Sequence, residues 1–409
     1  MKGLDRYRQL RNRYKSKLII HPIMTGGILG TDVQRKLNEE EWIKIGYSVC
    51  YDCLEGRSGL ISKPPIRDFL KDIAEFFGGD LAEHTFGCRA AQFSVAKTIS
   101  GHLKDDSSKD YANILVVDSL CHYTTIMAAE MNGLRVVEVP NNGYPEYRIE
   151  AEDYAKKIEE IKEKTGKLPG LIMATHVEPH YGNLNPVKDI GRIAGEYNIP
   201  YMINGAYTAG ILPLSIKNLK ADFLTASAHK SMASLGPLGF VVTQHDWEKR
   251  LFQKSSTTTD WSGRSFEAKA INIFGCSVGG TPLISSMYSF PNVVERVRNW
   301  DEELRKTCWL AEELEKLDGV KLLGTRPHRH HLIAFETPIF WEISKHHKRK
   351  GFFLAEEMIK RGIVGLHKGL SKHMKFSVYG LNWDQVRLIR DSFNDIAEEF
   401  IKKFDISLK

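Results

Sequence analysis

The segment Ser227-Ala228-His229-Lys230 carries the residue of this chain best suited to covalent chemistry. It follows an apolar run at residues 221–226 and precedes a Gly236-Pro237-Leu238-Gly239 turn. A lysine held between small residues and a rigid turn is partly desolvated, which favours its neutral, nucleophilic amine. Such an amine can form a Schiff base with an aldehyde cofactor. A single lysine is a weak signal because most lysines are solvated, so the neighbouring motifs must decide its role.

Further polar motifs occur where a ligand-binding edge of a sheet would need them. The turn Thr85-Phe86-Gly87-Cys88-Arg89 leads into a helix, and a helix start offers free N–H groups to a phosphate. His122 follows an apolar run and either stacks on an aromatic ring or caps the next helix. Asn204, after another apolar run, would direct its amide at a ligand. His176 and Asn183 follow a third apolar run and are expected ring or substrate contacts.

The cysteines form a second candidate site. Cys50 and Cys53 make a C-x-x-C pair, and Cys276 is a third thiol in a glycine-rich segment. Thiols at this spacing can share a metal, form a disulfide or pass on a persulfide. The chain has no second C-x-x-C, so a four-cysteine structural zinc site is not expected. Three unrelated buried thiols are the alternative interpretation, and Cys121 and Cys308 are expected to be structural.

The elements that must position these residues alternate between strands and helices over residues 70–245. Strands are expected at residues 114–117, 136–139, 171–174, 201–203 and 240–242, with helices at 123–132, 152–164 and 187–197. Continuous apolar strands separated by helices are typical of a parallel sheet covered on both faces. Ligands of such a sheet bind at the carboxyl ends of its strands. A long helix at 291–317, with Pro291 at its start, is expected to lead into a smaller α+β domain.

Length and composition indicate a globular protein with more than one domain. The 409 residues predict an N-terminal basic arm with the C-x-x-C segment at 1–69, a large cofactor-binding domain at 70–290 and a small C-terminal domain at 291–409. No apolar run reaches the length of a membrane span, and the first residues lack the apolar core of a signal peptide. Six cysteines in so long a chain do not make a disulfide scaffold. We expect a cytoplasmic enzyme with reduced thiols and no membrane partner.

The net charge of +6 is unevenly distributed. Basic residues gather at residues 6–17, where tyrosines are interleaved, at 326–331, which is rich in histidine, and at 345–350. Basic patches with aromatic residues suit a nucleic-acid backbone. Solvated helix faces and loops explain the same clusters equally well.

The phosphate-turn, histidine, asparagine and lysine motifs, in this order along the chain, resemble the fold-type I pyridoxal-phosphate enzymes. The resemblance implies an α/β fold with a mostly parallel seven-stranded sheet, a small C-terminal α+β domain and a homodimer. It also implies pyridoxal 5'-phosphate as cofactor. Asn204 departs from the carboxylate that most of these enzymes place against the ring nitrogen, so the electron sink should be weaker and suit a good leaving group on the β-carbon. The residues implied as cofactor contacts are Cys88, Arg89, His122, Asn204, Ser227, Ala228, His229 and Lys230.

More narrowly, the chain resembles the O-phosphoseryl-tRNA:cysteinyl-tRNA synthases, an archaeal family. The matching segments are 21–27, 47–53, 88–93, 122–124, 204–207, 227–230 and 274–276. The resemblance implies that phosphoseryl-tRNA(Cys) loses phosphate and gains sulfur, with Lys230 as the Schiff-base lysine and general base. It implies that Cys50, Cys53 and Cys276 are catalytic, either delivering sulfur as a persulfide or ligating an iron–sulfur cluster. Phosphoseryl-tRNA synthetase is an expected partner and DNA is not.

The sequence differs from this family at two places, and two other functions are alternatives to the one that the resemblance implies. The chain has Cys88 where the family more usually has a small apolar residue, and its histidine-rich segment at 326–331 is a second difference. A cysteine desulfurase or lyase acting on a free amino acid would share the lysine and a reactive cysteine but would not need basic arms. A non-catalytic tRNA-binding scaffold would keep the fold without the Schiff base.

Overall fold

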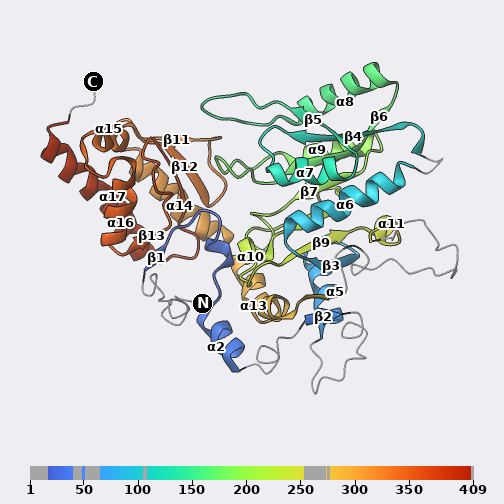
Figure 1. Ribbon diagram of the computed structural model, residues 1–409, viewed down its shortest axis with the longest axis horizontal. Coiled ribbons are helices and arrows are strands. Elements are labelled where there is room, and N and C mark those ends of the chain that lie inside the picture. The colour runs from blue at the N-terminus through green and yellow to red at the C-terminus, as the bar shows by residue number, and fades with distance from the viewer. Residues whose placement is uncertain are drawn as a thin grey trace, which may run out of the picture. The chain divides into compact units, whose positions relative to one another are not determined.

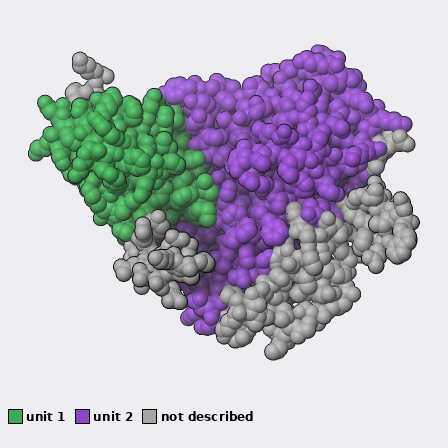
Figure 2. All heavy atoms as spheres, viewed as in Figure 1, with its two compact units in different colours: residues 1–25, 305–323, 331–409 green, residues 26–304, 324–330 purple. Residues whose placement is uncertain are grey.

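The structure of the protein, a computed structural model, describes residues 17–39, 48–50, 65–104, 108–252, 273 and 277–406. The chain divides into two compact units, coloured in Figure 2. The smaller unit comprises residues 1–25, 305–323 and 331–409, and the larger comprises 26–304 and 324–330. These units do not follow the three expected segments, because strand β1 (Leu18–Ile19) pairs with β13 (Ile363–Val364) and joins the N-terminal segment to the smaller unit.

The larger unit is built on a seven-stranded sheet in the order β3-β9-β8-β7-β6-β4-β5 (Figure 1). The five strands from β8 to β5 are parallel, and β9 is antiparallel to both of its neighbours. The mostly parallel sheet is therefore confirmed. Its strands are β3 (Leu81–Thr85), β4 (Tyr111–Asp118), β5 (Arg135–Val139), β6 (Leu168–Thr175), β7 (Tyr201–Asn204), β8 (Phe223–Ala226) and β9 (Gly239–Thr243).

Helices cover the two faces of this sheet because successive strand residues point to opposite sides. Leu115 and Val117 of β4 pack in one apolar cluster with α6 (Cys88–His102) and α7 (Tyr123–Met131). Their neighbours Ile114 and Val116 pack in another cluster with α5 (Ile66–Phe76), α8 (Ala151–Thr165) and α9 (Val187–Glu196). The helices expected at 123–132, 152–164 and 187–197 are confirmed to within one residue at each end.

Short elements complete the larger unit. They are η1 (Thr25–Gly27), α2 (Thr31–Glu39), α10 (Ala228–Ser231), α11 (His245–Glu248) and an antiparallel pair of strands, β2 (Ser48–Cys50) and β10 (Ser277–Gly279). No helix in the described ranges is long and apolar enough to cross a membrane.

The prediction of one long helix over residues 291–317 is wrong, because the structure has two helices there. Helix α13 (Gly280–Arg298) runs through Pro291, and α14 (Trp300–Leu314) begins after Asn299. The apolar face of α13 continues on both sides of the proline, with Leu283 and Val293 fully buried. Burial of that face outweighs the single N–H that the proline lacks.

The smaller unit has the α+β composition that the sequence indicates. Its antiparallel sheet has the order β11 (Lys321–Leu323), β12 (Leu332–Glu336), β14 (His373–Ser377). The helical elements that accompany it are α14 from Arg305 onward, α15 (Pro338–His346), η3 (Lys350–Phe352), α16 (Phe353–Lys360) and α17 (Trp383–Phe404). One apolar core joins the sheet to these helices.

Candidate active site

A cavity of about 320 Å³ lies at the carboxyl ends of the parallel strands. Its walls come from the loops that follow β4, β6, β7 and β8 and from the start of α6. Segments far apart in the sequence therefore meet here. The lining residues are Phe86, Gly87, Cys88, Arg89, His122, Tyr123, Thr124, Thr175, Pro179, Asn204, Ala206, Tyr207, Ser227, His229 and Lys230.

Lys230 projects from the short helix α10, and its Nζ lies 4.9 Å from the centroid of the Tyr207 ring. Burial lowers the pKa of this amine, with Cys88 opposing the shift and Arg89 adding to it. The lysine turn is held from behind by η1. A Cβ on Gly27 would lie 2.0 Å from the carbonyl oxygen of His229, so only glycine lets these two segments approach so closely. The Gly26-Gly27 pair of the N-terminal segment thus supports the lysine.

The start of α6 forms the second wall of the cavity. Gly87 is the N-cap residue at φ +88°, and no side chain caps the helix. The first helical bond runs from the N–H of Ala91 to the carbonyl of Gly87, which leaves the preceding N–H groups of the helix without intrahelical partners. The ring of His229 packs behind this turn, because a Cβ on Gly87 would be 3.3 Å from its Cε1. The arrangement suits a phosphate at the helix start.

His122 both caps a helix and faces the cavity, so the two sequence interpretations are compatible. Its Nδ1 accepts a hydrogen bond from the backbone N–H of Thr124 at 3.3 Å, at the start of α7. The proton of the neutral ring is therefore on Nε2. Burial, followed by the charges of Lys230 and Arg89, lowers the pKa of His122 to about 4. The ring is thus uncharged at neutral pH.

Asn204 lies at the end of β7 and is almost fully buried. Its Oδ1 accepts hydrogen bonds from the Ala206 N–H at 3.1 Å and from the Cys88 thiol at 3.4 Å. Burial raises the pKa of Cys88 to about 11, which keeps the thiol protonated. These contacts place a neutral amide, rather than a carboxylate, in the cavity wall.

Some expected contacts lie elsewhere. His176 is buried against Thr208, with Nδ1 3.0 Å from its Oγ1, and is not among the residues that line the cavity. Asn183 is also absent from the lining and instead ties loops together, donating to the carbonyl of Glu146 and accepting from the N–H of Thr325. Neither residue lines the cavity that contains Lys230, so their roles as ring or substrate contacts stay predictions. Both side chains leave a strand end as expected, but side-chain direction there depends on loop contacts that the sequence pattern does not report.

Other residues were predicted only in part or missed. Ala228 is fully buried but does not line the cavity. Sequence reasoning missed Tyr207, although it stands three residues after Asn204, and Tyr123, which follows His122. Thr175 at the end of β6 was also missed, and its buried Oγ1 has no hydrogen-bond partner within the described ranges.

The cysteine site is described only in its backbone. Cys53 and Cys276 lie outside the described residues, and Cys50 ends strand β2. The register of β2 with β10 pairs Cys50 with Ser277, the residue that follows Cys276 in the sequence. Among the residues that the structure describes, no group of three His, Cys, Asp or Glu side chains could hold a metal.

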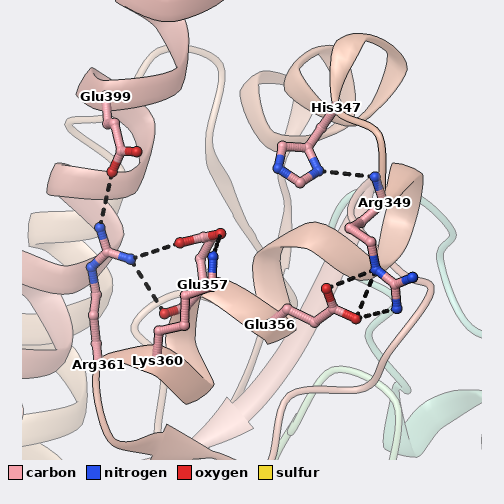
Figure 3. A network of polar contacts seen from close by, with 7 residues as sticks. All are labelled: His347, Arg349, Glu356, Glu357, Lys360, Arg361 and Glu399. Carbon is pink, nitrogen blue, oxygen red and sulfur yellow. Dashed lines mark hydrogen bonds and ion pairs between the residues drawn. The ribbon is translucent and has the colours of Figure 1, made fainter.

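The two C-terminal basic clusters are less available than their composition indicates. In the segment 326–331 all three histidines are buried, and the Nε2 of His330 lies 3.1 Å from the carbonyl oxygen of Tyr207. In the segment 345–350, the guanidinium of Arg349 binds the carboxylate of Glu356 (Figure 3). The backbone N–H of Arg349 donates a hydrogen bond to Nδ1 of His347. Some basic side chains of both segments are therefore buried or bonded within the fold, which leaves fewer of them to contact a nucleic acid.

The fold and the lysine cavity define a class of protein, the fold-type I pyridoxal-phosphate enzymes, and comparison with known proteins agrees. Residues 66–368 match the aminotransferase class-V family. A solved SepCysS–SepCysE N-terminal domain complex contains a chain that is 40% identical, with a TM-score of 0.85, covering 98% of this chain and 100% of that one. A cysteine desulfurase from Thermococcus onnurineus, 16% identical with a TM-score of 0.71, shares the fold over 98% of this chain and 99% of that one.

Comparison with characterised relatives identifies the family within this class of enzymes. O-phospho-L-seryl-tRNA:Cys-tRNA synthase 2 of Archaeoglobus fulgidus is 45% identical over 97% of this chain and 98% of that protein. The corresponding synthase of Methanopyrus kandleri is 42% identical over 97% of this chain and 98% of that protein. The chain therefore belongs to the aminotransferase class-V family and, within it, to the O-phospho-L-seryl-tRNA:Cys-tRNA synthases.

The residues present fit pyridoxal phosphate, the cofactor of this class of enzyme. The helix start at α6 offers unpaired N–H groups to a phosphate. Lys230 offers a partly desolvated amine to an aldehyde. The buried Thr175 Oγ1 of the lining has no hydrogen-bond partner within the described ranges, and Asn204 brings a neutral amide to the same cavity.

His176, directly after the cavity residue Thr175, gives a prediction for stability against pH. Complete burial lowers its pKa to about 4 from the ordinary 6.5. The pKa of His176 in the folded protein lies below its pKa in the unfolded chain. Its contribution to the free energy of unfolding is therefore present above pH 6.5 and is lost as the pH falls towards 4. Between pH 7 and pH 5 the wild type should lose about 2 kcal/mol more of its free energy of unfolding than His176→Gln.

Urea unfolding of both proteins at the two pH values measures this difference. His245→Gln, a change at an exposed histidine, serves as the control. Equal pH dependence in the wild type and in His176→Gln would show that the buried ring does not resist protonation.

Proposed function

We propose that this protein converts O-phosphoseryl-tRNA(Cys) to cysteinyl-tRNA(Cys) by eliminating phosphate from the β-carbon and adding sulfur. The observation that carries the proposal is the partly buried Lys230 in a cavity whose other walls are a helix start and the neutral side chains of His122 and Asn204. It is supported by relatives of nearly the same length that are named for this reaction.

Pyridoxal phosphate, when bound, supplies an electron-withdrawing ring that acidifies the α-carbon of the substrate. The Nζ of Lys230, whose pKa burial lowers, takes the α-proton as general base. The electron pair left on the α-carbon expels phosphate from the β-carbon. A sulfur nucleophile then adds to the β-carbon, and Lys230 returns the proton to the α-carbon. Arg89, exposed at the rim with its guanidinium 5.3 Å from the Tyr123 ring centroid, supplies positive charge for a phosphate.

Replacing Lys230 tests its role directly. Lys230→Ala should lose the visible absorption band of the Schiff base and reduce turnover of phosphoseryl-tRNA by at least about 100-fold, the usual contribution of a general base. Lys217→Ala, at an exposed lysine of the same unit, should keep both. Absorption spectra and single-turnover assays of the two variants give the measurement. A Lys230→Ala protein that retained the band would refute the assignment.

We propose that Cys50, Cys53 and Cys276 handle the sulfur, as a persulfide relay or as ligands of an iron–sulfur cluster. The supporting observation is the strand register that pairs Cys50 with the residue after Cys276. Three thiolates suit either chemistry. Iron and sulfide analysis of anaerobically purified wild type and Cys50→Ala distinguishes the two, because only a cluster gives iron that disappears with the thiol.

We also propose a homodimer that works in the cytoplasm, with phosphoseryl-tRNA synthetase as a partner. Cys50 lies in a two-stranded sheet separate from the sheet whose edge holds Lys230, so thiols of one subunit could serve the cavity of the other. Sedimentation combined with activity tests this arrangement. A variant that is fully active as a monomer contradicts it.

For tRNA we propose contacts through the N-terminal basic arm and the 345–350 cluster. Residues 1–16 of the arm lie outside the described residues. Within the cluster, Lys345 pairs with Glu342 and Arg349 with Glu356, whereas Lys348 is exposed and forms no ion pair within the described ranges.

Neighbouring residues of the same unit extend this surface. The backbone of Gly369 packs against Gly351, and the exposed ring of Phe352 lies beside it. Lys368 and Lys372, on either side of that contact in the sequence, are exposed and likewise form no ion pair in the described part of the chain. Lysines around an exposed aromatic ring suit a phosphate backbone and a stacked base.

The triple change Lys348→Glu, Lys368→Glu and Lys372→Glu should weaken tRNA binding and flatten its salt dependence. Each lost phosphate contact lowers the slope of log K against log salt by roughly 0.7 to 0.9. A matched triple in the larger unit, Lys164→Glu, Lys188→Glu and Lys217→Glu, changes the net charge equally and should affect binding less. Filter binding over a salt series measures both. If both triple variants weakened tRNA binding equally, the surface around Lys348, Lys368 and Lys372 would not be a specific tRNA contact.

A further inference from the structure

A row of aromatic rings runs outward from the loop that follows β6. Pro179 of this loop lines the cavity, and His180 and Tyr181 are the next two residues. The Tyr181 ring is stacked on Tyr147, from the loop that follows β5, with centroids 3.9 Å apart and planes at 1°. Tyr144 meets Tyr147 edge-on, with centroids 6.3 Å apart and planes at 83°. The row therefore begins beside the cavity and ends at Tyr144, which is 57% exposed.

A buried carboxylate holds the inner part of this row in place. Glu178 is fully buried and accepts backbone N–H groups of its own loop. The donors are those of His180 at 2.6 Å, Tyr181 at 2.9 Å and Asn183 at 2.9 Å, and they occupy both carboxylate oxygens. The Tyr181 ring is thus positioned before any ligand arrives. A surface that is already ordered loses little conformational entropy on binding.

Asn183 joins this loop to two others. Its Nδ2 donates to the backbone carbonyl oxygens of Glu146 at 2.8 Å and Tyr147 at 3.1 Å. Its Oδ1 accepts a hydrogen bond from the backbone N–H of Thr325 at 2.7 Å. One amide therefore holds together the loop after β5, the loop after β6 and the loop that contains Thr325, all within the larger unit.

The third of these loops carries positive charge. Arg326 and Arg329 follow Thr325 closely in the sequence, and both are exposed. Arg329 forms no ion pair in the part of the chain that the structure describes. Single-stranded nucleic acid binds where aromatic rings are available to stack on its bases and cations are available to its phosphates. The three loops combine these two features.

We propose that this aromatic row binds the single-stranded 3′ end of the tRNA, with a base stacked on Tyr144 and a backbone phosphate paired with Arg329. The amino acid of an aminoacyl-tRNA is esterified to the last nucleotide of that end. When the seryl group enters the cavity, the nucleotides beside it must therefore lie along the rim, where the row begins. Asn183 is a positioning residue that acts through the loops it joins. The proposal rests on the proposed function and names the part of its tRNA substrate that the larger unit contacts.

The contact explains how one cavity can distinguish phosphoseryl-tRNA from free phosphoserine. Both bring the same phosphate and the same reacting carbons, but only the tRNA brings bases to the row. Binding energy from such a remote part of a substrate can orient the reacting group in the cavity. Tyr144 and Arg329 are therefore specificity-determining residues outside the cavity that contains Lys230.

The test compares two forms of deacylated tRNA(Cys), one intact and one shortened by its single-stranded 3′ nucleotides. Filter binding uses the full-length protein loaded with pyridoxal phosphate. The wild type should bind the intact tRNA about 5- to 100-fold more tightly, the range for loss of a base stacked on an aromatic ring. Tyr144→Ala should lose this preference and bind both forms as the wild type binds the shortened one. Tyr144→Phe, the matched control, retains the ring and should retain the preference.

Two further variants test the charge and the positioning amide. Arg329→Ala should lower the slope of log K against log salt by about 0.7 for intact tRNA. Arg135→Ala, at an exposed arginine that begins β5, should leave the slope unchanged. Asn183→Asp keeps the shape of the side chain but cannot donate to the carbonyls of Glu146 and Tyr147. It should therefore lower the preference for the intact end while its cofactor absorption band stays as in the wild type.

A Tyr144→Ala protein with the wild-type preference would overturn the proposal, as would equal binding of the two tRNAs by the wild type. A Tyr144→Ala protein that keeps the preference but sediments differently assigns the ring to a contact between subunits instead. Should Tyr144→Ala fail to fold, the salt slope of Arg329→Ala decides, and an unchanged slope contradicts the proposal. A wild type that binds neither tRNA contradicts the proposed function itself, so the two failures are distinguishable.

Discussion

Desolvation of one amine at the open edge of the parallel sheet is the constraint on which the other features of the site depend. Lys230 can act as nucleophile and base only if its turn is partly withdrawn from water and still reaches the cavity. Two glycine contacts make this possible. A Cβ on Gly27 would lie 2.0 Å from the carbonyl oxygen of His229, and a Cβ on Gly239 would lie 2.4 Å from that of Ala226. Side chains at either position would force the layers around the lysine turn apart.

Neutral groups in the wall follow from the same constraint. His122 is uncharged because burial and the nearby cations lower its pKa to about 4, and Asn204 carries no charge. A cavity with a lysine, an arginine at the rim and unpaired helix N–H groups is positive, which suits a substrate that brings a phosphate.

Much of the site was predictable because its residues follow strands whose apolar runs are unmistakable. His122, Asn204 and Lys230 fall at the carboxyl edge once the sheet is parallel, and the structure brings them into one cavity with Cys88, which was predicted from its glycine turn rather than from an apolar strand. Sequence could not show that Asn183 turns away to hold loops, since that depends on a backbone N–H at Thr325 far along the chain. Nor could it show that α13 continues through Pro291, where packing decides against the local signal. Cys53 and Cys276 lie outside the described residues, so their grouping with Cys50 stays a prediction.

The central claim is that Lys230 drives elimination of phosphate from a seryl group carried by tRNA. Phosphate release in the absence of a sulfur donor measures that step alone. Protein is mixed with phosphoseryl-tRNA(Cys) or with free phosphoserine, and inorganic phosphate is followed over a single turnover. The account predicts release from the tRNA-linked substrate and little or none from the free amino acid. Equal release from both, or release from neither, would contradict it.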